Sequence, residues 1–173
     1  EIHDPTPYPN CRTAIWQDAG KARVIYFSPA QWTWPVVRRL VFDTDCDLIY
    51  LNSLFSPSFT IRPLLLQLAR MIPSKPTILA PRGELSLGAL ALKKTKKQAF
   101  LYCMRIAGLY RRVKWQASTS DEESDIRRSF GDKAHVLIAP DLRSPCCGAV
   151  RALTKRKLPG KATFAFLSRI SRK

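Results

Sequence analysis

Apolar residues along the chain alternate between short runs and longer amphipathic segments. The short runs are rich in β-branched and aromatic residues and predict strands at 23–27, 47–51, 77–80, 114–118, 135–139 and 163–167. The longer segments have helical periodicity and predict helices at 30–42, 59–72, 87–113 and 121–130. Strands that alternate with helices predict the α/β class with a Rossmann-like, doubly wound parallel sheet. Residues 1–22 lack such periodicity and predict an irregular lead-in, and residues 143–161 have the composition of a linker.

Two of the predicted helices carry further signals. The helix over 87–113 is expected to break near Lys93, and its residues 99, 102, 103, 106, 107, 109 and 110 predict an apolar side that packs on the sheet. The opposite side is a basic stripe. The helix over 121–130 is preceded by Ser120, and Glu123 follows three residues later, which is the pattern of a capping box. Cap chemistry alone therefore accounts for Glu123.

Polar residues stand where the predicted strands end. They are Asn52 and Ser53, then Arg82, Gly83 and Glu84, then Thr119 and Ser120, and finally Asp141. In open α/β sheets, ligands bind beyond the carboxyl ends of the strands, so these residues predict a binding face. Arg82 and the lysines from Lys93 to Lys97 are candidate anion ligands, and Glu84 is a candidate hydrogen-bonding or basic carboxylate. No Gly-rich phosphate loop and no Ser-His-Asp pattern is present.

The charge of the chain points to an anionic partner. Lys and Arg number 29 against 13 Asp and Glu, a formal charge of +16. Such an excess attracts phosphates on nucleotides, nucleic acid or lipid headgroups, and charge alone leaves the choice among them open. The basic stripe has two interpretations: it solvates a surface helix, or it docks on anionic lipid headgroups at about 1 kcal/mol per basic residue.

The five cysteines are scattered and show no metal-ligand spacing, so we expect reduced thiols, a reducing cytosol and no metal site. No apolar run approaches the length of a membrane span, and the N-terminus has no signal-peptide pattern. The chain starts without Met, which favours a missing N-terminal portion.

Four segments carry the most informative residues of the chain: Asp47–Phe55, Ala80–Ser86 with the following 89–97, Thr119–Glu123 and Phe166–Lys173. In this order and at this spacing, the four segments closely resemble family-4-type glycosyltransferases of the GT-B superfamily. The resemblance implies two Rossmann-like domains, of which 23–142 is the acceptor-side domain and 162–173 begins the donor-binding domain. It implies transfer of a sugar from a nucleotide-diphosphate sugar to a cell-envelope polysaccharide or glycolipid, with retention and without a metal or other cofactor. The expected location is cytoplasmic, at the inner face of the membrane.

The resemblance also assigns site residues. It implies acceptor-binding roles for Asn52, Ser53, Arg82, Gly83, Glu84, Lys93, Lys97, Ser120 and Glu123, and a donor-phosphate role for Arg169. Asn52 stands where the family commonly has histidine, and Asp141 where it has asparagine. The family's opening strand and Gly-rich loop and its C-terminal glutamate pair are not seen, so we expect the chain alone to be inactive. A non-catalytic acceptor- or anion-binding module is the alternative, and a nucleic-acid-binding protein is a weaker one.

Overall fold

The computed structural model of the 173-residue chain describes residues 12–140. Tertiary contacts divide the chain into the units Glu1–Asp141 and Leu142–Lys173, and every described residue belongs to the first. The predicted linker at 143–161, the predicted strand at 163–167, Asp141 and Arg169 lie outside the described residues.

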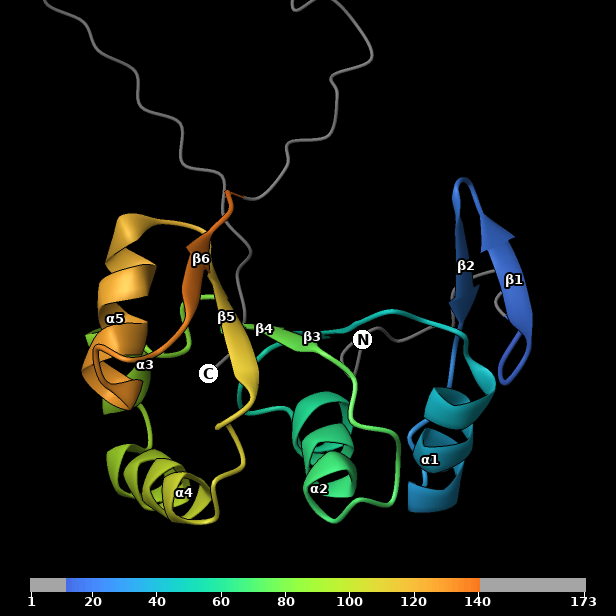
Figure 1. The fold of residues 1–173 in the computed structure, drawn as a ribbon, viewed down its shortest axis with the longest axis horizontal. Coiled ribbons are helices and arrows are strands. Elements are labelled where there is room, and N and C mark those ends of the chain that lie inside the picture. Colours follow the sequence, from blue (N-terminus) through green and yellow to red (C-terminus); the bar gives the residue numbers. More distant parts are fainter. Residues whose placement is uncertain (1–11, 141–173) are drawn as a thin grey trace, which may run out of the picture. The chain divides into compact units, whose positions relative to one another are not determined.

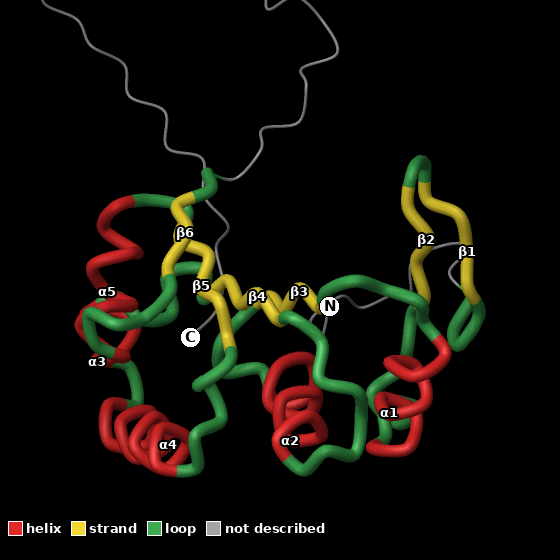
Figure 2. Tube along the Cα trace, viewed as in Figure 1, coloured by secondary structure: helices red, strands yellow, loops and turns green. Residues whose placement is uncertain are grey.

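Four parallel strands form the main sheet (Figures 1 and 2). They are β3 (Ile49–Asn52), β4 (Thr77–Ala80), β5 (Val113–Ala117) and β6 (Val136–Ile138), hydrogen-bonded in the order β3-β4-β5-β6. Leu51 lies opposite Leu79, and Leu79 lies opposite Trp115. The predicted α/β class and the parallel pairing of these strands are confirmed.

Every described helix except the one that begins at Lys94 starts with a side-chain cap or with a proline in its first turn. The helices are α1 (Trp34–Asp43), a π-helical turn η1 (Pro57–Ile61) that continues into α2 (Arg62–Leu68), α3 (Leu87–Ala91), α4 (Lys94–Ile106) and α5 (Ser120–Phe130). Pro35 lies in the first turn of α1, as predicted, where its missing N–H has no intrahelical partner to lose. The side chain of Ser86 accepts a hydrogen bond from the Ala89 amide and caps α3.

One predicted strand belongs to a different sheet. The run at 23–27 contributes β2 (Ala22–Ile25), which pairs antiparallel with β1 (Trp16–Ala19) instead of joining the parallel sheet. The irregular lead-in predicted over 1–22 is therefore wrong for residues 16–19. Gly20 adopts φ 64° between the two strands, a conformation that suits a tight hairpin turn. The sequence of β1, Trp-Gln-Asp-Ala, is too polar to stand out by hydrophobicity.

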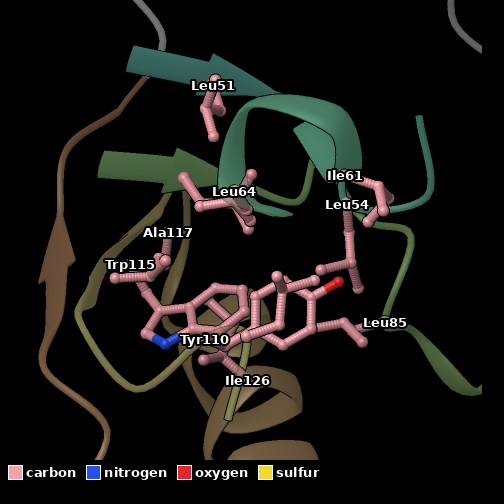
Figure 3. Packing of buried hydrophobic residues seen from close by; sticks show 12 residues of the cluster. Leu51, Leu54, Ile61, Leu64, Leu85, Tyr110, Trp115, Ala117 and Ile126 are labelled. Atoms are coloured by element: carbon pink, nitrogen blue, oxygen red, sulfur yellow. The ribbon is translucent and has the colours of Figure 1, made fainter. Parts of the chain in front are cut away.

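The helices cover one face of the parallel sheet. Each strand pairs with the next strand in the sequence, and right-handed crossovers in such an order place every connecting helix on the same side. Leu64 of α2 and Ile126 of α5 accordingly pack with Leu79 and Trp115 in one buried cluster, part of which Figure 3 shows. On the opposite face, Tyr50, Asn52, Lys114 and Leu137 are exposed. Within residues 12–140, the second helical layer of a doubly wound sheet is not found.

Aromatic residues close the core beneath β5. The ring centroid of Trp115 lies 4.3 Å from that of Phe130 and 5.6 Å from that of Tyr110. Tyr110 reaches the core because the chain leaves helical geometry at Gly108, whose φ is 69°. The predicted helix 87–113 consequently ends at Ile106, while its expected break is confirmed at Lys93, which has φ 57°.

The orientation predicted for the long helix is wrong. Phe100, Leu101 and Met104 are the α4 side chains that pack against the core cluster. Within α4 the predicted core side instead lies in water: Tyr102 is 68% exposed and Ile106 is 70% exposed. Leu109 and Tyr110, predicted for the same side, are buried as expected, but they lie beyond the end of the helix. Apolar residues occur on both sides of α4, so periodicity alone cannot decide which side faces the sheet.

Candidate functional site

The loops at the carboxyl ends of β3 and β4 are joined by Glu84. Its carboxylate accepts hydrogen bonds from the hydroxyl of Ser53 at 2.7 Å and from the amides of Leu54 and Phe55. The Ser53 amide in turn donates to the carbonyl of Ala80 at 3.0 Å. Ser53 adopts φ 76°, a conformation that costs free energy in a non-glycine residue and that this network stabilises. The role of Glu84 in this geometry is to hold the two loops together.

A second carboxylate, Glu122, joins the β4 loop to the end of β5. Glu122 is 6% exposed and accepts three hydrogen bonds of 2.7 Å, from the amides of Gly83 and Ser118 and from the hydroxyl of Ser118. Burial opposes ionisation of Glu122, but these hydrogen bonds and the positive charge of Arg82 outweigh burial and lower its pKa below the ordinary value of 4.5. Glu122 is therefore an ionised structural link.

Arg82 lies above this framework on the uncovered face of the sheet. It adopts φ 55° and donates from Nε to Oδ1 of Asn52 at 2.8 Å and from Nη2 to the Tyr50 hydroxyl at 3.1 Å. Tyr50 donates to Oε1 of Gln116, and Nε2 of Gln116 donates to the carbonyl of Ala139 at 2.9 Å. A polar network thus crosses the sheet from β3 to the end of β6.

The structure brings together five of the residues predicted for the site: Asn52, Ser53, Arg82, Gly83 and Glu84. The other four have different surroundings. Nζ of Lys97 donates to the carbonyl of Ala89 at 2.6 Å and lies 5.1 Å from the ring centroid of Phe55, whereas Lys93 precedes α4 as its N-cap residue. Ser120 is the first residue of α5, and Glu123 forms an ion pair with Arg127 at 2.7 Å.

Sequence reasoning missed Tyr50, Gln116, Ser118 and Glu122. The prediction that Ser120 caps this helix is wrong by one residue. Thr119 is the N-cap of α5, and its hydroxyl accepts a hydrogen bond from the Glu122 amide at 3.2 Å. The chain reads Thr-Ser-Asp-Glu-Glu at 119–123, so it offers both Thr119 with Glu122 and Ser120 with Glu123. No sequence pattern marks Tyr50 and Gln116 as site residues, because they lie inside strands and their side chains meet only when the sheet forms.

The exposed part of the site favours binding over proton transfer. The two carboxylates are occupied by amide and hydroxyl donors, which leaves a guanidinium, an amide and a phenol on the accessible side. His135, the only histidine within 12–140, directly precedes β6 and so lies at the opposite edge of the sheet. The described residues also contain no group of three side chains suited to hold a metal ion.

Comparison of this chain with family models, with curated proteins and with solved structures finds no match.

Proposed function

We propose that this chain forms the acceptor-side part of a GT-B-type glycosyltransferase that uses a nucleotide-diphosphate sugar to extend a cell-envelope polysaccharide or glycolipid. The observation that carries the proposal is the network of Arg82, Asn52, Tyr50 and Gln116 on the open face of the parallel sheet. Planar groups with several donors and acceptors suit hydroxyl-rich ligands, and a guanidinium adds affinity for a carboxylate or phosphate on them.

The topology of the sheet supports the same position for the acceptor. Strands β3 to β6 run in one direction from β3, which has no further strand on its free edge within residues 12–140. In open α/β sheets, ligands bind beyond the carboxyl ends of the parallel strands. The site at the ends of β3 and β4 is in that position.

A non-catalytic acceptor- or anion-binding module is the alternative function. It is favoured by the absence, among the described residues of the site, of an unoccupied carboxylate or a histidine. Both functions predict oligosaccharide binding by this chain, and they differ in whether the full-length protein transfers sugar. A nucleic-acid-binding function has only the net charge of +16 in its favour.

The test measures binding of neutral and uronate-containing oligosaccharides to the 173-residue chain by saturation-transfer NMR. We expect binding that weakens about tenfold in Arg82→Gln, a loss of one charge-assisted contact. Arg39→Gln, which removes an equal charge from exposed α1, is the matched control and should bind normally. If no oligosaccharide binds, or if both variants behave alike, the proposal is refuted. If oligosaccharide binding depends on Arg82 as expected, a second assay measures sugar transfer by the full-length protein. Transfer would indicate the enzyme, and binding without transfer would indicate the non-catalytic module.

We propose in addition that α4 lies on an anionic membrane surface. Its water-exposed side carries Ala99, Tyr102, Cys103 and Ile106, flanked by Lys94, Lys96 and Arg105. Between Glu84 and Asp121 the chain has eight basic residues and no acidic one, which complements anionic lipid headgroups. Apolar side chains between lysines are typical of helices that lie in the membrane interface. No helix within 12–140 is long and apolar enough to span a bilayer.

A further inference from the structure

A cavity of about 410 Å³ lies at the edge of the sheet opposite to the site described above. Thr77, the first residue of β4, and Val113, the first residue of β5, both line it, so it is at the amino ends of these strands. Residues after α2 and after α4 close its sides. Its volume lies within the range of small-molecule sites.

Three arginines and no acidic residue line this cavity. Arg70, Arg111 and Arg112 contribute guanidinium groups, and Ser74, Gln67 and Thr77 contribute neutral polar groups. The side chain of Arg112 donates to the hydroxyl of Ser74 at 3.2 Å. Like charges that share a small volume repel one another, and a bound anion removes that repulsion.

The ends of α2 and α4 place these arginines around the cavity. Arg70 adopts φ 55° just after α2, where its amide donates to the carbonyl of Gln67 and the Met71 amide donates to the carbonyl of Leu66, the hydrogen-bond pattern that closes a helix. At Gly108, with φ 69°, a Cβ would lie 2.8 Å from Cδ of Arg111. The absence of a side chain at Gly108 therefore lets Arg111 lie over the turn.

Apolar residues form the rest of the cavity wall. They are Leu64, Leu68, Leu109 and Val113. A wall with arginines on one part and aliphatic side chains on another suits a ligand that has an anionic group on an organic body. Phosphate groups fit the guanidinium fork with two parallel hydrogen bonds, and a phosphate monoester carries more negative charge than a carboxylate, which suits a site with three arginines.

We infer that this cavity binds a phosphate-bearing ligand, with Arg70, Arg111 and Arg112 around the phosphate. The inference is independent of the proposed glycosyltransferase function, because the cavity and the carboxyl-edge site share no residue. A soluble phosphate ester and a phospholipid headgroup present the same chemical group, so the experiment has an arm for each.

The experiment uses the 173-residue chain. Isothermal titration with inorganic pyrophosphate forms the first arm, and co-sedimentation with vesicles of phosphatidylcholine containing phosphatidic acid forms the second. The variant Arg111→Gln/Arg112→Gln removes two of the three charges from the cavity. Lys21→Gln/Arg39→Gln removes an equal charge from exposed positions that neither line the cavity nor belong to α4, and it is the matched control.

We expect pyrophosphate to bind the parent chain and the control variant alike, and the Arg111→Gln/Arg112→Gln variant at least tenfold more weakly. Vesicle binding that pyrophosphate displaces would assign the site to a lipid headgroup, and pyrophosphate binding without vesicle binding would assign it to a soluble ligand. Equal weakening in both variants would show diffuse attraction by the net charge and overturn the inference. Failure of the parent chain to bind in both arms would also overturn it. Unchanged circular dichroism of the arginine variant confirms that it has folded.

Discussion

Replacement of Glu122 tests whether the carboxyl-edge loops depend on this one buried carboxylate. In Glu122→Ala the amides of Gly83 and Ser118 lose their acceptor. A buried hydrogen bond to a charged group contributes about 1.5–3 kcal/mol. Because Gly83 is exposed and Ser118 is half-buried, we expect their three hydrogen bonds to Glu122 to contribute less than this each, and the free energy of unfolding to fall by about 3 kcal/mol in all. Glu122→Gln keeps one carbonyl oxygen but turns an NH₂ group toward the remaining donors, and we expect a loss of about half as much.

The dependence on pH has a defined sign. The pKa of Glu122 is lowered in the folded chain, so its ionised form stabilises the fold fully above its ordinary pKa of 4.5. That contribution is lost as the pH falls through the lower pKa of the folded state. The difference in stability between the parent chain and Glu122→Gln should therefore be largest at neutral pH and shrink as the pH falls below 4.5.

Urea denaturation followed by tryptophan fluorescence measures these differences, because Trp115 is buried beside Phe130 in the core. Glu123→Gln is the matched control: it removes the adjacent carboxylate, whose partly exposed pair with Arg127 contributes less than about 1 kcal/mol. Equal losses in Glu122→Gln and Glu123→Gln at pH 7, or a Glu122→Gln effect that does not change with pH, would refute the structural role assigned to Glu122.

Two further predictions concern Tyr110 and the exposed side of α4. The Tyr110 hydroxyl is buried without a hydrogen-bond partner among the described residues, and burial together with the charge of Glu84 raises its pKa, so Tyr110→Phe should raise the free energy of unfolding by about 1 kcal/mol. A loss of stability in the same urea titration would contradict this. Tyr102→Ser/Ile106→Ser should weaken co-sedimentation with phosphatidylglycerol vesicles about tenfold at constant net charge, whereas Phe42→Ser, on α1, should not. Equal binding by both variants would show that α4 does not enter the membrane surface.

Strands that stand between strong chain breaks could be predicted from the sequence. The strand prediction at Thr77–Ala80 matches β4, because four apolar or β-branched residues lie between Pro76 and Pro81. The end of α5 was equally readable, since Gly131 follows it with φ 90°. These boundaries depend on the backbone properties of single proline and glycine residues, which can be read directly from the sequence.

Features that depend on tertiary contacts could not be predicted. The side of α4 that faces the core is decided by the match of Phe100 and Met104 to the cluster under the sheet, while Tyr102 and Ile106 are just as apolar. The site was predicted where polar residues follow a strand, as at Arg82. Its extension to Tyr50 depends on side chains from separate strands meeting on one face.

The strand order has a consequence for how this part of the chain is made. Because β3, β4, β5 and β6 lie side by side in the order in which they are synthesised, β4, β5 and β6 each find a neighbour already present when they leave the ribosome. Only β3, the first strand of the described sheet, waits for a partner encoded later, and each pairing closes a loop no longer than one crossover. The sheet can thus grow by addition at one edge during translation, which limits the time for which an unpaired apolar strand is open to aggregation.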